Sequence, residues 1–136
     1  MQTDNGFLEK KGMLAVSGTD IPKPLKVSEY LSMLYEFKRQ CPLKRLTEHF
    51  GLEGFMNKKV GTLSRGMAQR VALVASLMHE EETLFLDEPM QGLDPFYKKQ
   101  LVKWIEHTKR AYLIVSHEIE SFKTLDCEVH TLESPS

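Results

Sequence analysis

The segment Thr83–Pro89 constrains the fold of this chain more than any other part of it. Three apolar residues run directly into two adjacent carboxylates, Asp87 and Glu88. A short apolar run bounded by polar residues predicts a buried strand over residues 83–86. The two carboxylates then lie at the carboxyl end of that strand, where open α/β sheets bind their ligands. An ordinary strand that ends in a solvated acidic turn would give the same pattern, so this segment alone leaves both interpretations open.

Three further segments favour a ligand site over the plain turn. Residues 63–70 read Leu-Ser-Arg-Gly-Met-Ala-Gln-Arg, residues 92–95 read Gly-Leu-Asp-Pro, and residues 114–118 read Ile-Val-Ser-His-Glu. In this order and at these separations, the four segments closely resemble the nucleotide-binding domain of ABC transporters. They look like that family's signature motif, Walker B strand, D-loop and switch histidine. The resemblance covers nearly the whole chain from about Leu25 onward.

A phosphate-binding loop of the type G-x-x-x-x-G-K-[ST] occurs nowhere in the sequence. The glycines in Asn5-Gly6 and Lys11-Gly12 lack its spacing and its Lys-Ser/Thr end. Such a loop supplies backbone N–H groups, a lysine and a Mg²⁺-binding hydroxyl. Family members carry this Walker A loop well before the signature motif. The resemblance therefore implies that this chain corresponds to the C-terminal part of such a domain.

Length and charge narrow the class of protein. The 136 residues fit one domain, and an apolar content of 41% with a charged content of 27% is typical of a soluble globular protein. A formal net charge of −1 gives no broad electrostatic reason to expect nucleic-acid binding. No apolar run approaches the roughly 20 residues that a transmembrane helix needs. Cys41 and Cys127 have no metal-ligand spacing, so we expect free thiols in a reducing cytosol.

Apolar periodicity and capping residues predict the secondary structure. Helices are expected over Val27 to about Lys38, over Lys44–Phe50 with Gly51 as its stop, from an N-cap at Ser64 onward, from Pro95 to about Lys109, and over Glu118–Leu125. Strands are expected at Met13–Val16, residues 83–86, Ala111–Val115 and Glu128–Leu132, with Ala111–Val115 as a second buried strand.

The two longest helices of the second half each carry an apolar face that we expect to pack against a core. In the helix that begins after Ser64, this face is a stripe of Val71, Val74 or Ala75, and Met78. In the helix that begins at Pro95, the residues predicted to point inward are Phe96, Leu101, Trp104 and Ile105.

Strands that alternate with helices predict a mostly parallel sheet. Together with the resemblance, this gives an α/β fold: an incomplete P-loop NTPase-type three-layer domain with a mostly parallel sheet plus the helical signature subdomain. Residues 1–136 are expected to form one partial ABC ATPase domain. Within it, about 25–80 would be the helical signature subdomain, and 81–136 would be the α/β part from the Walker B strand to the switch histidine.

The resemblance assigns roles to three residues that would serve ATP bound in their own domain. Asp87 would hold Mg²⁺, directly or through water, Glu88 would be the general base, and His117 would reach the γ-phosphate. The chemistry of the two acids agrees, because a carboxylate that leaves a buried strand commonly holds Mg²⁺ and a second one can deprotonate water. A lone histidine after a strand is more often structural, but residues 114–117 match the family's switch.

Ser64, Arg65, Gly66 and Met67 would bind nucleotide in trans. Ser64 stands where a helix N-cap belongs, and the free N–H groups of a helix N-terminus bind phosphate. The family pattern reads L-S-G-G-Q, and here Arg65 and Met67 replace its third and fifth residues. In this family two domains pair head to tail, so the segment would contact the γ-phosphate of ATP held by the other domain. A plain N-cap serine followed by a tolerated glycine is the structural alternative.

Two loops of the family have counterparts here. Asp94 would belong to the D-loop, which communicates across the dimer; an Asx-turn before Pro95 is the structural alternative. The family also has a glutamine in a loop ahead of the helical subdomain, and that loop senses the γ-phosphate and transmits to the membrane partner. The corresponding region is about Val16–Gly18, where Ser17 stands in the likely place of the glutamine.

Three functions remain open on the sequence. The first is a partial ATP-binding subunit of an ABC transporter, an ATPase part with ATP and Mg²⁺ as cofactors, which would not bind ATP tightly alone. The second is a non-catalytic chain that donates its signature motif in trans to a complete ATPase domain. The third is a truncated gene product with no function of its own. The implied partners are a membrane-spanning transporter subunit and a second ATP-binding domain, as homo- or heterodimer, at the cytoplasmic face of the membrane, without nucleic acid.

Overall fold

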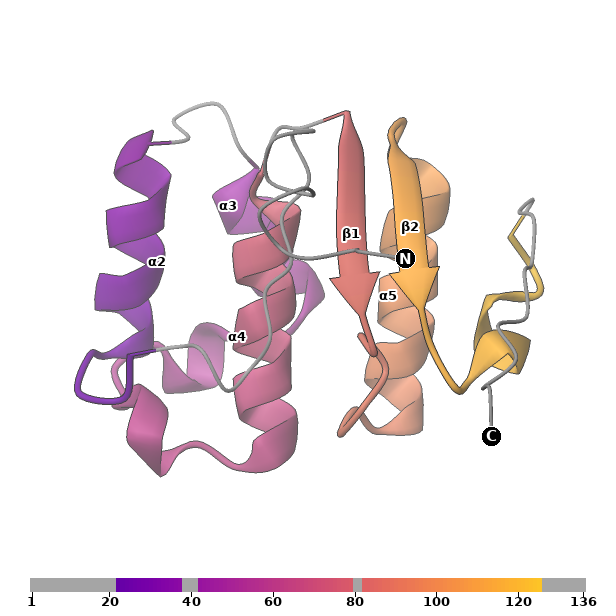
Figure 1. Ribbon diagram of the computed structural model, residues 1–136. Helices are drawn as coiled ribbons and strands as arrows, with labels where there is room; N and C mark the ends of the chain where they lie inside the picture. The colour runs from indigo at the N-terminus through magenta and orange to yellow at the C-terminus, as the bar shows by residue number, and fades with distance from the viewer. Residues whose placement is uncertain (1–21, 38–41, 80–81, 126–136) are drawn as a thin grey trace, which may run out of the picture.

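The computed structural model describes residues 22–37, 42–79 and 82–125. Two parallel strands, β1 (Thr83–Asp87) and β2 (Ala111–Val115), pair along their whole length, with Thr83 opposite Ala111 and Asp87 opposite Val115. This confirms parallel pairing between the two segments. Because the strands run in the same direction, their carboxyl ends lie together at one end of the sheet (Figure 1).

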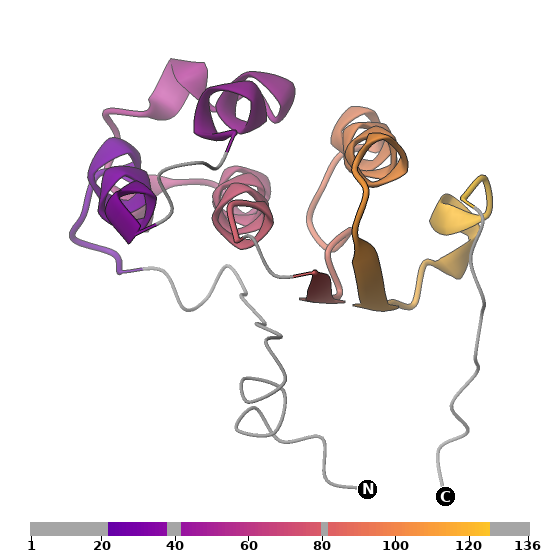
Figure 2. The same ribbon diagram turned by 90° about the horizontal axis from the view of Figure 1, so that it is seen from above.

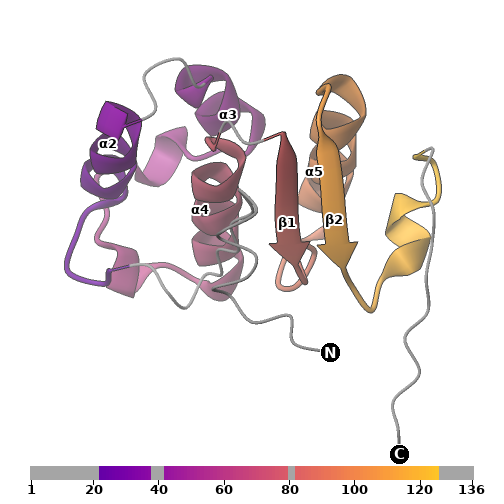
Figure 3. The ribbon, with the colours of Figure 1, turned by 45° about the horizontal axis from the view of Figure 1, so that its top comes forward.

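The described α-helices are α2 (Val27–Phe37), α3 (Leu43–His49), α4 (Arg65–Leu77) and α5 (Pro95–His107). Short 3-10 turns lie at η2 (Glu53–Phe55), η3 (Val60–Thr62) and η4 (Ile119–Phe122). In Figure 3, α2, α3 and α4 are grouped beside β1, and α5 lies behind the two strands.

Two of these elements differ from the predicted ones. The helix expected at Glu118–Leu125 is only a 3-10 turn, η4, and α3 begins and ends one residue before the predicted Lys44–Phe50. Gly51 follows α3 with a φ of 65°, a left-handed conformation that glycine adopts without a steric penalty.

α4 begins after Ser64 because the serine side chain caps it. The Ser64 Oγ accepts a hydrogen bond of 3.2 Å from the backbone N–H of Met67, as the sequence predicts. From Val71 to Met78 every residue is buried, so the second half of α4 is enclosed on all sides. All residues of the predicted apolar stripe are buried, as expected, and their neighbours are buried too, because α4 packs against α2, α3 and β1 together.

α5 begins after Asp94 for a similar reason. The Asp94 Oδ1 accepts a hydrogen bond of 3.0 Å from the N–H of Tyr97, and Pro95 occupies the first turn, where its missing N–H is not needed. The helix ends at His107 instead of the predicted Lys109. The hydroxyl of Thr108 donates to carbonyls of the last turn at this end of the helix.

The prediction that Phe96 points inward is wrong, because its side chain is 59% exposed. Leu101, Trp104 and Ile105 are buried as predicted, and they define the inward face of α5. One helical turn before Leu101, this face falls on Tyr97 and not on Phe96. The ring of Phe96 instead packs edge to face on Tyr97, with ring centroids 5.0 Å apart.

The prediction that β2 is a buried strand is also wrong. Tyr112 and Ile114 pack against the core, but Leu113 is 48% and Val115 41% exposed. Successive strand residues point to opposite faces, and α5 covers only one of them. In Figure 2, no described helix lies over the opposite face of the two strands.

The core connects the helices to the sheet. Buried apolar residues of α2, α3 and α4 form one cluster with Leu84 and Leu86 of β1 and with Leu101 of α5. No helix of the described segments is long and apolar enough to cross a membrane. Several predictions lie outside the described residues: Met13–Val16, the Val16–Gly18 loop with Ser17, Lys38, Cys41, Cys127 and Glu128–Leu132.

Candidate functional site

Two acidic residues lie at the carboxyl end of β1. Asp87 is the last residue of the strand and is exposed. Glu88 continues the ladder, because its N–H donates to the carbonyl of Val115 at 2.7 Å. Its φ of 48° lies in the left-handed region, which costs a non-glycine residue on the order of 1–3 kcal/mol. The backbone thus turns sharply at a residue that the sheet still holds in place.

Glu88 and His117 are in contact across the ends of the two strands. The Nδ1 of His117 lies against the Oε1 of Glu88, and the His117 backbone N–H donates to Oε2 at 3.4 Å. Oε1 is shielded from solvent and receives no well-directed hydrogen bond within the described segments, so its contact with His117 is an ion pair only when the imidazole is protonated. The Glu88 side chain is 24% exposed and that of His117 94%. The carboxylate is therefore partly covered by a ring that is itself open to a ligand.

The side chains around Asp87 offer few ligands for a Mg²⁺ ion on its own. Across the described segments, no group of three His, Cys, Asp or Glu side chains could hold a metal ion. Mg²⁺ at nucleotide sites usually takes one or two carboxylates, and its other ligands are phosphate oxygens and water. A single exposed carboxylate beside Glu88 is compatible with Mg²⁺ in the company of a bound nucleotide.

The four predicted signature residues lie together at the start of α4. Ser64 and Arg65 are exposed, and Gly66 and Met67 are partly so. A Cβ built on Gly66 would lie 2.9 Å from the carbonyl oxygen of Gly92 in the loop after β1. Gly92 itself has a φ of 83° and faces the aliphatic part of Arg65. Both positions need glycine, since a side chain at either would meet a close neighbour or a strained backbone.

Two helix starts meet at this contact. Ser64 caps α4 and Asp94 caps α5, and both border a shallow depression of about 140 Å³. Its lining includes Gly66, Arg70 and Tyr97. The predicted signature and D-loop segments thus form one continuous surface of the same chain.

The structure brings the predicted site residues together in two groups. Asp87, Glu88 and His117 lie at the carboxyl ends of β1 and β2. The signature residues gather with Asp94 at the starts of α4 and α5.

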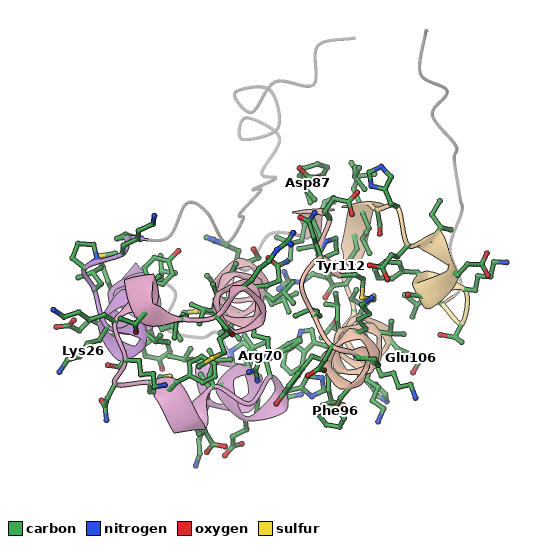
Figure 4. The ribbon with its side chains drawn as sticks, turned by 90° about the horizontal axis from the view of Figure 1, so that it is seen from below. Lys26, Arg70, Asp87, Phe96, Glu106 and Tyr112 are labelled. Atoms are coloured by element: carbon green, nitrogen blue, oxygen red, sulfur yellow. The ribbon has the colours of Figure 1, made fainter. Side chains whose placement is uncertain are left out.

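The turn after β1 connects the two groups. Gln69 of α4 donates from Nε2 to the carbonyl of Pro89 at 3.1 Å. In Figure 4, Asp87 lies at the carboxyl end of the sheet, while Arg70 lies among α3, α4 and α5. The link between signature helix and acidic turn is therefore a side chain to backbone contact.

Sequence reasoning gave no role to several residues beside these groups. Arg70 stacks over the ring of Tyr97, with its guanidinium carbon 4.0 Å from the ring centroid. The Nζ of Lys98 pairs with the Oε1 of Glu118 at 2.6 Å, next to His117. Helical spacing from Leu101 could have predicted that Tyr97 points inward. No sequence pattern indicates the Lys98–Glu118 pair, because its partners are 20 residues apart on different elements.

Comparison with known protein families agrees with these features. The sequence model described as "ABC transporter" matches residues 5–91, which include the signature segment and both acids at the carboxyl end of β1. The match begins before Leu25, where the resemblance was expected to start. It ends before Asp94 and His117, so these two residues lie outside it.

Curated relatives carry related descriptions. The chain is 32% identical over 103 residues to the ABC transporter ATP-binding protein NatA of Bacillus subtilis, which covers 71% of this chain and 42% of that protein. It is 36% identical over 99 residues to the tungstate uptake system ATP-binding protein TupC of Peptoclostridium acidaminophilum, which covers 70% of this chain and 46% of that protein. The chain thus spans less than half the length of these relatives.

Solved structures with the same fold include an ATP-binding subunit of an ABC transporter, with a TM-score of 0.67 at 24% identity over 82% of this chain and 51% of that one. A dimeric ATP-binding cassette in a post-hydrolysis state with ADP and Pi gives 0.66 at 24% identity, over 90% of this chain and 60% of that one. The fold is therefore an incomplete P-loop NTPase-type α/β domain, of which the described residues hold two parallel strands and the helices beside them. With this fold and the family match over residues 5–91, the chain belongs to the ABC transporter family of ATP-binding proteins.

Proposed function

We propose that this chain is part of the ATP-binding subunit of an ABC transporter, in which ATP hydrolysis drives transport through a membrane-spanning subunit at the cytoplasmic face of the membrane. The observation that carries the proposal is the Glu88–His117 pair beside Asp87, at the carboxyl ends of two parallel strands. Open α/β sheets bind ligands at the carboxyl ends of their strands. The curated relatives described as ATP-binding proteins support it.

Each residue of this group then has a role that suits its surroundings. Glu88 accepts the proton of the attacking water, and its fixed backbone and small exposure favour a defined orientation. His117, whose ring is open to solvent, contacts the γ-phosphate. Asp87 holds Mg²⁺, which neutralises charge on the phosphates when bound.

The second group faces a second ATP-binding domain, in a homo- or heterodimer. Ser64, Arg65, Gly66 and Met67 offer the start of α4 to the γ-phosphate of ATP held by that domain, and Asp94 accompanies them. Their exposure and their common surface support this role. In this proposal residues 25–80 are the helical signature subdomain and residues 81–136 the α/β part.

A phosphate-binding loop has to come from other sequence, and the edge of β2 away from β1, which no described strand occupies, is a suitable place for the strand that precedes such a loop. Ala111 donates to the Glu82 carbonyl and Val115 accepts from Glu88, so these β2 residues bond toward β1. The backbone groups of Tyr112 and Ile114 therefore point to the opposite edge. A parallel strand added there would end beside His117, where its loop could reach the same nucleotide.

Phosphate release at saturating Mg-ATP tests the proposal in two steps. The isolated chain is expected to show negligible turnover, because the loop that positions the β- and γ-phosphates is missing. Adding a polypeptide that carries a strand and phosphate loop from a relative should produce turnover that Glu88→Gln removes. Turnover of roughly 1–100 s⁻¹ by the chain alone, or a complemented activity that survives Glu88→Gln, contradicts it.

A second candidate function is a non-catalytic chain that donates its signature in trans to a complete ATPase domain. The exposed start of α4 in a sequence without a phosphate loop favours it. Stimulation of a complete domain by this chain, without complementation by a phosphate-loop polypeptide, would identify it. A truncated gene product with no function should instead be insoluble, and an in-frame phosphate-loop motif in the DNA just upstream would indicate a split or incompletely read gene.

A further inference from the structure

The first turns of α5 lie between the signature helix and the segment that carries His117. Tyr97 contacts Arg70 of α4, and the adjacent Lys98 contacts Glu118. The two contacts start from neighbouring residues of one short helical segment. A displacement of α4 is therefore passed through the first turns of α5 to the segment that carries His117.

The contact on the signature side centres on Arg70. Its guanidinium stacks on the ring of Tyr97 at 4.0 Å and lies 5.1 Å from the ring centroid of Phe55. One of its terminal nitrogens donates to the carbonyl of Phe50 at 3.0 Å and to that of Gly51 at 3.4 Å. A planar guanidinium can stack and donate at the same time, which a lysine ammonium cannot do. Arg70 thus fixes α4 to the end of α3 and to α5 at once (Figure 4).

The contact between α5 and the segment that carries His117 is an ion pair. The Nζ of Lys98 lies 2.6 Å from Glu118 Oε1, with the two side chains 29% and 39% exposed. The Glu118 N–H also donates to the Oγ of Ser116 at 2.9 Å, so both neighbours of His117 are held. Such a half-exposed pair contributes little to stability. Its consequence is geometric, since it sets the distance between α5 and the turn that aims the imidazole at Glu88.

We propose that Tyr97 and Lys98 are positioning residues that couple the signature helix to the His117–Glu88 pair. A shift of α4 moves Tyr97 through Arg70, and Lys98 moves with it and pulls on Glu118. The link is a property of this chain, and only its use rests on the proposed function: contact of the signature with a second domain would adjust the histidine of this one. Spatial adjacency alone does not establish coupling, so the test must measure it directly.

The ring C–H signal of His117 in NMR spectra of the full chain is the readout, assigned with His117→Gln. Arg70→Lys is the perturbation on the signature side, and it is introduced into three backgrounds: wild type, Lys98→Gln and Lys99→Gln. Lys99→Gln is the matched control, because Lys99 is the exposed neighbour on the same helix. Arg70→Lys should shift the His117 signal in wild type and in the control, and the shift should fall about threefold or more in Lys98→Gln.

Two rescues separate positioning from a general structural role. The charge exchange Lys98→Glu with Glu118→Lys should restore the response to Arg70→Lys, and 1 M salt should weaken it in wild type, because an exposed ion pair is screened. Tyr97→Phe, which keeps the ring, should leave the His117 signal in place, whereas Tyr97→Leu should move it. If Arg70→Lys does not fold, Tyr97→Leu serves as the perturbation in all three backgrounds.

An equal shift of the His117 signal in the Lys98→Gln and Lys99→Gln backgrounds would overturn the proposal, and so would the absence of any shift with both Arg70→Lys and Tyr97→Leu. The measurement uses no nucleotide and no partner domain. Its outcome is therefore independent of the phosphate-release assay, and failure of one does not imply failure of the other.

Discussion

Gly66 at the start of α4 lies directly against the carbonyl of Gly92 in the loop after β1, so closely that a Cβ on Gly66 would be 2.9 Å from that oxygen. Ordinary van der Waals contact requires a larger separation. The contact holds the signature segment on the loop that leads into Asp94 and α5. Glycine at position 66 is thus explained by packing within this chain, in addition to any role with nucleotide.

Gly66→Ala should destabilise the protein by about 1–3 kcal/mol, the usual effect of overpacking. Helix propensity opposes this by up to about 1 kcal/mol, since alanine is the better helix former. Urea unfolding followed by circular dichroism measures the difference. Gly54→Ala is the matched control, because a Cβ there meets no atom within 4 Å. Equal stability of the two variants would show that the loop gives way without strain.

In mixtures with a complete ABC ATP-binding domain, Ser64→Arg should remove any stimulation by this chain, by roughly tenfold or more. Glu88→Gln should leave the site on the partner largely intact. The reason is that, in the proposed function, the signature acts on nucleotide held by the other domain, whereas the carboxylate serves its own. Thr62→Arg introduces the same side chain at an exposed position outside the signature and controls for charge. Equal loss from Ser64→Arg and Glu88→Gln would contradict this division.

Stability should fall as the pH rises above about 10 because of Tyr112. Burial raises the pKa of Tyr112 above its ordinary value of 10.0, and the hydrogen bond with Thr108 and the charge of Arg110 oppose this only in part. The unfolded chain therefore loses this proton at lower pH than the folded one, so the stabilisation is complete below pH 10 and lost as the pH rises through the folded pKa. One such group lowers the unfolding free energy by at most about 1.4 kcal/mol per pH unit.

Denaturant unfolding between pH 8 and 11 measures this effect. Tyr112→Phe removes the titrating hydroxyl and should flatten the decline relative to wild type. Tyr35→Phe changes an exposed tyrosine of α2 in the same way and serves as the control. Identical pH profiles for the wild type and Tyr112→Phe would show that Tyr112 does not contribute.

Leu113→Lys should reduce self-association of the isolated chain. Leu113 is 48% exposed on the face of the sheet that no described helix covers, and β2 pairs with no described strand at its edge away from β1. Exposed apolar strands at such an edge recruit other strands. The change in unfolding free energy should stay within about 0.5 kcal/mol, as for most surface substitutions. Sedimentation velocity against protein concentration is the measurement. Met33→Lys, at a residue of α2 that is 44% exposed, is the control and should change association much less.

The features that the sequence determined are those that depend on neighbouring residues. Ser64 and Asp94 cap the helices that follow them, because a serine or aspartate oxygen reaches an N–H only three residues away. The apolar run before Asp87 forms a strand, and the alternation of strand and helix gave its parallel pairing with Ala111–Val115. The order of the four motifs was enough to indicate the family, which the match over residues 5–91 confirmed.

Only the tertiary structure decided which residues face which neighbours. The direction of α5 against the sheet set Tyr97 inward and Phe96 outward, and α5 covers the face of β2 that carries Tyr112 and Ile114, while Leu113 on the other face is exposed. Contacts between distant segments, such as Arg70 with Tyr97 and Lys98 with Glu118, have no local signal at all. The physical reason is that a cap or a strand is formed by interactions within a few residues, whereas burial and pairing depend on elements that only the folded chain brings together.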